Sequence, residues 1–227
     1  MAISSRRGRA GALTEGRGRG RVIRGVAVVV VAVGVLSGCA PSDPVADLTP
    51  AERSVIRGKL AAQNWEVVTS RFPFATRPEV SVVHTTDDGS WPGSMVGCLR
   101  SAGFTVYVDG RYFQFGSTAG RSTEDFALGT YLCSSRYPRA DDVMRFLDRD
   151  RLEALFGYFT GTVRPCLVLS GVKSEPPPTL SAFLRGVEAR NSWNPYRLAW
   201  SSPIPAPRLA FLERLCPSLP AWMDVAE

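Results

Sequence analysis

The residue types that carry most enzyme chemistry are sparse in this chain and are not spaced as catalytic motifs. His84 is the only histidine among the 227 residues. A Ser-His-Asp triad would have to use it, yet the sequence contains no G-x-S-x-G nucleophile elbow. A single histidine also excludes HExxH and other multi-histidine metal sites. We therefore expect His84 to be a packed or edge residue of a strand rather than a catalyst.

Ser170 and Lys173 match the S-x-x-K spacing, in which one helix face presents a nucleophilic hydroxyl and an amine. Here, however, Gly171 follows the serine, where an apolar helical pattern ends. No S-D-N or K-T-G sequence occurs downstream. The pattern therefore favours a helix C-cap at Ser170 over a nucleophile.

Acidic residues come in pairs, but none has the D-x-D-x-D-G spacing of a calcium loop. Carboxylates can also serve as general acid and base in a hydrolase, provided that the fold sets their separation. The sequence does not give that separation, so solvated loops or helix caps are the simpler expectation. The cysteines form no C-x-x-C pair, and we predict neither a metal nor a cofactor. The acidic pairs are Asp87-Asp88, Asp141-Asp142 and Asp148-x-Asp150.

The N-terminal residues have the composition of a secretion signal. Residues 1–24 hold seven Arg and one Glu, and residues 25–36 are an uncharged apolar run. Twelve residues are too few to span a bilayer, which requires about 20. A basic segment before a short apolar segment is typical of a cleaved signal peptide.

The apolar run ends in LSGC, which resembles the lipobox of bacterial lipoproteins. The resemblance implies a diacylglycerol on the sulfur of Cys39 and cleavage just before this residue. Two or more acyl chains anchor a protein stably to a membrane. We therefore expect a lipoprotein signal peptide over 1–38, a lipidated tether over 39–48, and a location at the outer face of the cell membrane.

Cleavage before Cys39 changes the charge of the protein. The whole chain has a formal charge of +6, and the predicted signal peptide alone accounts for all of it. A domain with no net charge lacks the general electrostatic attraction to nucleic acid. We therefore predict no nucleic-acid partner.

Two seven-residue segments share one pattern: CLRSAGF at 98–104 and CLVLSGV at 166–172. Each places a cysteine near the end of an apolar helical pattern and a glycine where a helix C-cap would fall. Four cysteines besides Cys39 in an oxidising compartment suggest two disulfides, for which three pairings exist. The repeat favours sequential pairing within two degenerate units, about 90–138 and 149–220. The favoured pairs are Cys98 with Cys133 and Cys166 with Cys216.

The remaining patterns predict an α+β fold, mostly helical, in a single globular domain over 49–227. Thr49, a following proline and Glu52 are typical of a helix start, and this helix should run to about Arg71. Ser122 with Asp125 predicts a second capped helix. Residues 149–171 predict a long helix with a kink near Pro165.

The strand signals are local. Residues 105–115 alternate on both sides of Asp109-Gly110, which predicts an antiparallel type I′ hairpin. Residues 80–86 are rich in β-formers, and we expect them to join the hairpin as a third strand.

The order of these motifs resembles uncharacterised secreted lipoproteins of high-GC Gram-positive bacteria. The shared features are a C-L-x-x-x-G helix, a hairpin containing DG, a P-C-L-x-x-x-G helix at 165–171, a W-x-P-Y turn at 193–196 and a late C-P. The resemblance implies a compartment and a disulfide framework. It implies no activity.

Aromatic residues gather in two segments and are the candidate binding surface. Exposed aromatic side chains with a polar tip suit sugar or protein partners. The alternative is that one hairpin face covers the helices and the other is partly masked. The candidates in the first segment, the hairpin, are Tyr107, Tyr112, Phe113 and Phe115. The candidates in the second segment, at 193–200, are Trp193, Tyr196 and Trp200.

Together these features predict a lipid-anchored binding or interaction module rather than an enzyme, with an envelope protein or a cell-wall glycan as its partner. Two alternatives stay open. A carboxylate-based hydrolase of cell-envelope material would require two acids that face each other in a buried pocket. A purely structural or assembly lipoprotein would have no concave apolar site.

Overall fold

The computed structural model describes residues 47–109, 112–116 and 120–226. Cys39, the predicted signal peptide and nearly all of the predicted tether lie outside these residues. The described part is α+β and mostly helical, with an antiparallel hairpin and two disulfides, as predicted. The described residues belong to one compact unit. None of the described helices is long and apolar enough to cross a membrane.

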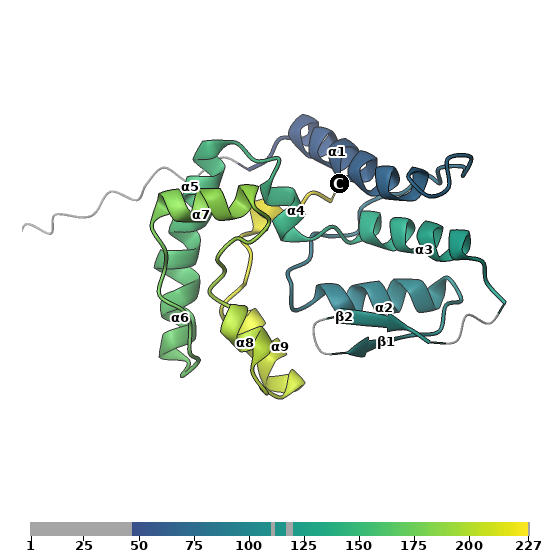
Figure 1. Ribbon diagram of the computed structural model, residues 1–227. Helices are drawn as coiled ribbons and strands as arrows, with labels where there is room; N and C mark the ends of the chain where they lie inside the picture. Colours follow the sequence, from purple (N-terminus) through teal and green to yellow (C-terminus); the bar gives the residue numbers. More distant parts are fainter. Residues whose placement is uncertain (1–46, 110–111, 117–119, 227) are drawn as a thin grey trace, which may run out of the picture. The chain divides into compact units, whose positions relative to one another are not determined.

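The described part of the chain is a succession of helices, with a long connection between the first and the second, and the hairpin is inserted between the second and the third (Figure 1). The elements are α1 (Pro50–Thr69), α2 (Trp91–Ser101), β1 (Val106–Asp109), β2 (Tyr112–Phe115), α3 (Thr123–Arg136), α4 (Ala140–Met144), α5 (Arg149–Tyr158), a π-helical turn (Phe159–Val163), α6 (Arg164–Leu169), α7 (Leu180–Glu188), α8 (Arg197–Ser201), α9 (Ala206–Leu215) and a 3₁₀ turn (Ala221–Met223).

Helices α1 and α3 begin with the capping boxes that the sequence predicts. Before α1, the hydroxyl of Thr49 accepts a hydrogen bond from the backbone N–H of Glu52 at 3.2 Å, and the Glu52 carboxylate accepts from the N–H of Thr49 at 2.8 Å. Ser122 and Asp125 form the same pair of bonds before α3. Each box satisfies two N–H groups that a helix start leaves free, and so fixes where the helix begins.

Helix α3 lies between α1 and α2 (Figure 1). Trp65 of α1 meets Tyr131 of α3 edge to face, with 5.1 Å between the ring centres. The side chains of α2, the hairpin and α3 form one hydrophobic cluster, which contains the buried Leu99 and Val106. A larger cluster combines α1 with the elements from α4 to the C-terminus. Both clusters draw on residues far apart in sequence.

The segment that contains residues 80–86 does not join the hairpin, so the prediction of a third strand is wrong. It runs instead beside the chain between α3 and α4. The N–H of Val83 donates to the carbonyl of Arg136, and the N–H of Thr86 donates to the carbonyl of Pro138, both at 2.8 Å. Among the described residues, this segment forms a single β-bridge, Thr86 with Arg139. The neighbouring segment cannot extend the ladder, because Pro138 lacks an N–H and α4 begins at Ala140.

The predicted long helix over 149–171 is interrupted near Pro165, as expected. The structure divides it into α5, the π-helical turn and α6. A proline inside a helix has no N–H for the preceding turn. The N–H of Arg164 bonds to the carbonyl of Phe159, five residues back, which is the bonding of a π-turn. The chain therefore accommodates Pro165 by a local change from α-helical to π-helical winding.

The repeated seven-residue pattern is a helix C-cap with one bonding scheme in both copies. In the first copy, the N–H of Gly103 bonds to the carbonyl of Arg100 and the N–H of Phe104 to that of Leu99. In the second copy, Gly171 and Val172 make the same two bonds to Val168 and Leu167. This is the Schellman motif, and both glycines have the positive φ that it requires, +83° and +76°.

The repeat also positions the two disulfides. In each copy the cysteine precedes a fully buried leucine, Leu99 or Leu167, and the residue after the glycine is buried as well. The leucine holds the helix end in the core, and the cysteine beside it reaches a second helix. The predicted bonds Cys98–Cys133 and Cys166–Cys216 are both present.

Candidate functional site

One face of the hairpin gathers polar and aromatic side chains. The strands pair in the register Tyr107 with Gln114 and Asp109 with Tyr112. Successive residues of a strand point to opposite faces, and directly paired residues share a face. These four residues therefore lie on one face, which we call the tyrosine face. Tyr107 is 46% exposed and Tyr112 is 74% exposed.

The side chains of the tyrosine face hold one another in place. The hydroxyl of Tyr107 donates to the amide oxygen of Gln114 at 3.1 Å, and the amide nitrogen of Gln114 donates to the carboxylate of Asp109. A chain of hydrogen bonds thus runs across both strands. It fixes the amide and the carboxylate beside two aromatic rings without burying any of them.

The opposite hairpin face packs against helices, so the prediction that Phe113 and Phe115 belong to an exposed surface is wrong. Phe113 lies 5.5 Å from Trp91 at the start of α2, and Phe115 lies 4.6 Å from Phe126 of α3, both measured between ring centres. Both side chains are partly buried against the cluster that includes Val106. One hairpin face thus covers the helices, as the alternative interpretation of the aromatic residues predicted.

Trp193 and Tyr196 are also core residues, and their prediction as binding-surface residues is wrong. Tyr196 has no exposed surface and Trp193 is 8% exposed. Trp193 packs against Phe156 and Phe159, with ring centres 6.3 and 6.2 Å away. Their sequence context resembles an exposed turn, but helices from elsewhere in the chain cover it.

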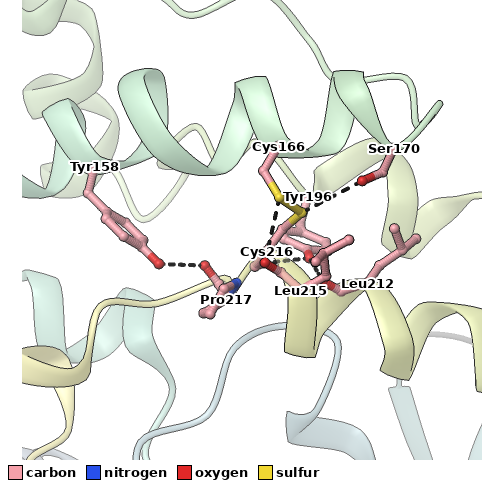
Figure 2. Close-up of a disulfide and its surroundings, with 8 residues drawn as sticks. All are labelled: Tyr158, Cys166, Ser170, Tyr196, Leu212, Leu215, Cys216 and Pro217. Atoms are coloured by element: carbon pink, nitrogen blue, oxygen red, sulfur yellow. Dashed lines mark hydrogen bonds between the residues drawn. A yellow bond between two sulfur atoms is a disulfide. The ribbon is translucent and has the colours of Figure 1, made fainter.

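The hydroxyl of Tyr196 lies at the end of α9, beside the second disulfide (Figure 2). It lies 2.9 Å from the carbonyl oxygen of Leu212 and 2.7 Å from that of Cys216, and it donates its single proton to this pair. The last carbonyl groups of a helix have no partner inside the helix. The N–H of the C-cap residue Cys216 also bonds to the carbonyl of Leu212, so Tyr196 supplements this cap and supplies a donor to the carbonyl of Cys216. Burial raises the pKa of the Tyr196 hydroxyl.

The acidic pairs are engaged in structural contacts. One carboxylate oxygen of Asp87 accepts from the N–H groups of Gly89 and Ser90 at 3.0 and 2.7 Å, and the other accepts from the hydroxyl of Ser218. Asp87 thereby ties the turn before α2 to the C-terminal segment. Burial raises the pKa of Glu213, and the charge of Asp87 raises it further.

A second acidic group surrounds Arg139. Its guanidinium forms an ion pair with Asp88 and lies 4.0 Å from the carboxylate of Asp141. Asp141 accepts a hydrogen bond from the hydroxyl of Ser192 at 2.8 Å. Burial, and then the charge of Asp88, raise the pKa of Asp141. These carboxylates thus balance an arginine and join α4 to the segment after α7.

The remaining residues with catalytic potential lie apart. His84 is exposed and meets the ring of Tyr137 edge to face at 5.2 Å. Ser170 is the C-cap of α6, as predicted, and its hydroxyl lies 3.9 Å from the sulfur of Cys216. No group of three or more potential metal ligands occurs among the residues that the structure describes.

Asp109 and Gln114 are the members of the tyrosine face that the sequence analysis did not select. The signal was the alternation of the two strands combined with their pairing across Asp109-Gly110. That alternation separates Tyr107 and Tyr112 from Phe113 and Phe115. Grouping the aromatic residues by type alone does not make this separation.

Comparison with protein-family models, with curated proteins and with solved structures found no match to this chain. The indications of its compartment therefore come from the molecule itself. Disulfides form and persist in oxidising environments and are rare in the cytosol. The two disulfides thus indicate an extracytoplasmic protein.

Proposed function

We propose that the protein is a lipid-anchored extracytoplasmic binding module that presents its tyrosine face to a glycan of the cell envelope. The observation that carries this proposal is the arrangement of Tyr107, Tyr112, Asp109 and Gln114 on one exposed hairpin face. The LSGC sequence before residue 40 supports the anchor through its resemblance to a lipobox.

The chemistry of the tyrosine face suits a sugar. The C–H face of a sugar ring is apolar and packs on an aromatic ring, while its hydroxyls both donate and accept hydrogen bonds. A tyrosine offers a ring and a polar tip in one side chain. Gln114 offers a donor and an acceptor, and the carboxylate of Asp109 offers acceptors only. Because these side chains already bond to one another, little ordering is needed on binding.

The size of the face favours a glycan over a protein. Strands of four residues are about 14 Å long, and the two strands lie about 5 Å apart. A standard protein interface buries about 800 Å² on each partner. The hairpin alone is too small for that, whereas it matches the length of a short run of sugar rings.

The test is co-sedimentation of the full protein, purified from membranes in non-ionic detergent, with insoluble cell-wall glycan. We expect the double variant Tyr107→Ser with Tyr112→Ser to bind at least tenfold more weakly than the wild type, a loss of about 1.4 kcal/mol. Melting temperatures should agree closely, since both side chains are exposed.

Phe74 provides the matched control, because it is an aromatic residue with 98% exposure outside the hairpin. Phe74→Ser should sediment with the glycan as the wild type does. Equal sedimentation of the hairpin variant and the wild type would refute the proposed site. Failure of the wild-type protein to sediment would refute the proposal that a cell-wall glycan is the ligand.

The anchor has a separate test. Metabolic labelling with a fatty-acid probe should mark the wild-type protein but not Cys39→Ala. Equal labelling of both proteins would show that the resemblance to a lipobox is misleading.

A further inference from the structure

A cleft of about 530 Å³ runs along α1 and α3, and none of the four residues of the tyrosine face lines it. This volume lies within the range of small-molecule sites, about 300–1,000 Å³. Its walls are largely apolar and include four aromatic rings. The apolar lining residues include Leu60, Val67, Val68, Phe72, Trp91 and Phe126.

The charged residues that line this α1–α3 cleft are mostly arginines. Arg71, Arg139 and Arg190 line it, against one acid, Asp142. Arg139 is already paired with Asp88. Arg71 and Arg190 have no side-chain hydrogen bond or ion pair with any residue that the structure describes. The cleft therefore combines an apolar wall with two arginines that form no ion pair with a described residue.

Arg190 lies in the left-handed region, with a φ of +56°, and it is the only non-glycine residue with positive φ among those described. The cause is a third Schellman cap, at the end of α7. The N–H of Arg190 bonds to the carbonyl of Val187, and the N–H of Asn191 bonds to that of Gly186. The two other caps of this type have glycine at the same position.

The comparison among these three caps suggests a function for Arg190. A residue with a Cβ is strained in the left-handed conformation, and glycine would remove the strain. The chain uses that solution at Gly103 and Gly171 but not here. Strained backbone residues cluster at binding and active sites. Among the described residues, the one strained non-glycine residue is also an arginine that lines the cleft and has no side-chain hydrogen bond or ion pair.

We propose that the α1–α3 cleft binds an amphiphilic anion, whose apolar body lies along α1 and α3 and whose acidic group pairs with Arg190. The acidic group is a carboxylate or a phosphate, since both accept the forked hydrogen bonds of a guanidinium. A free fatty acid and a lipid headgroup are the two sources of this chemistry. The site is independent of the tyrosine face and does not require a glycan.

The test is photolabelling of the full protein in non-ionic detergent with dodecanoate that carries a terminal benzophenone. Peptide mapping should place the label on peptides of α1 and α3. The corresponding alcohol, which has the same apolar body and no charge, should label these peptides at least tenfold less efficiently.

Arg190→Gly is the decisive variant, because affinity and stability should change in opposite directions. Labelling by the acid should fall about tenfold and labelling by the alcohol should stay the same. The melting temperature should rise by about 2–4 °C, as the left-handed strain is removed. Arg190→Asn, which tolerates the same backbone conformation, should lose acid labelling equally.

Arg208 provides a control, as an exposed arginine on α9 that does not line the cleft. Arg208→Gln should label as the wild type does. Competition with free dodecanoate and with dodecyl phosphate distinguishes the two sources, and stronger competition by either supports an amphiphilic anion. Equal labelling by acid and alcohol, or undiminished acid labelling of Arg190→Gly, would overturn the proposal.

Discussion

Replacement of the cap glycines by alanine tests the repeated pattern quantitatively. At Gly171 an added Cβ would meet no heavy atom within 4 Å, so the cost of Gly171→Ala comes from the backbone alone. A left-handed conformation costs a residue with a Cβ about 1–2 kcal/mol. Alanine also restricts the unfolded chain, which returns about 0.4–1 kcal/mol. We expect a net loss of about 1 kcal/mol.

Gly103→Ala should cost more, although the cap is the same. The added Cβ would lie 2.5 Å from a guanidinium nitrogen of Arg121. Arg121 must then move from its place 4.5 Å above the ring of Phe104, where it also donates to the carbonyl of Ala102 at 3.0 Å. A surface cation–π contact and a hydrogen bond contribute roughly 0.5–1.5 kcal/mol each. The total should reach about 2–3 kcal/mol.

Urea denaturation of both variants and the wild type measures these free energies, with equal m-values as the check that the folded state is intact. The melting temperature of Gly171→Ala should fall by about 2–4 °C, and that of Gly103→Ala by about twice as much. A Gly171→Ala protein as stable as the wild type would refute the left-handed cap. Equal losses at the two sites would refute the contribution of Arg121.

Three further predictions concern the framework. Replacement of Cys98 and Cys133 by alanine should cost about 2–5 kcal/mol by urea denaturation, whereas free thiols at these positions in the native protein would contradict the bond. Tyr196→Phe removes the buried hydroxyl that bonds to the carbonyls of Leu212 and Cys216 and should cost about 1–3 kcal/mol; no loss would mean that water replaces the hydroxyl. The pKa of Glu213 is raised, so its contribution to stability is complete below its ordinary pKa of 4.5 and is lost as pH rises through the raised value. The stability of Glu213→Gln relative to the wild type should therefore be greater near pH 7 than near pH 4. The opposite order would mean that the fold lowers the pKa of Glu213 instead of raising it.

The features that the sequence predicted correctly depend on few residues. The capping boxes at Thr49 and Ser122 each need two side chains three positions apart. The hairpin needs alternation and a turn between the two strands. The disulfide pairing followed from the repeated cap, since each copy places its cysteine beside a buried leucine at a helix end.

The features that the sequence analysis missed depend on contacts between distant segments. Residues 80–86 have strand propensity, but their neighbour in space contains Pro138 and cannot extend a ladder. Trp193 and Tyr196 lie in a segment that is typical of an exposed turn, yet the larger hydrophobic cluster covers them. Propensity describes what a segment can form, and the packing partner decides whether it does.

The candidate sites were predictable only in part. Alternation combined with strand pairing across Asp109-Gly110 assigns Tyr107 and Tyr112 to one hairpin face and the two phenylalanines to the other. No local pattern marks Arg190, because its left-handed conformation follows from the end of α7 at Glu188. Arg190 stands out only when the three caps are compared, because the two others have glycine at the same position.

The central claim is that the tyrosine face contacts the envelope in the native setting. Hydroxyl-radical labelling of the protein in intact envelopes and after purification reads this contact residue by residue. Tyr112 and Phe74 are both well exposed in the isolated fold and serve as probe and reference. We expect Tyr112 to be protected from oxidation in the envelope and reactive after purification, while Phe74 reacts equally in both preparations. Equal oxidation of Tyr112 in the two preparations would contradict the claim.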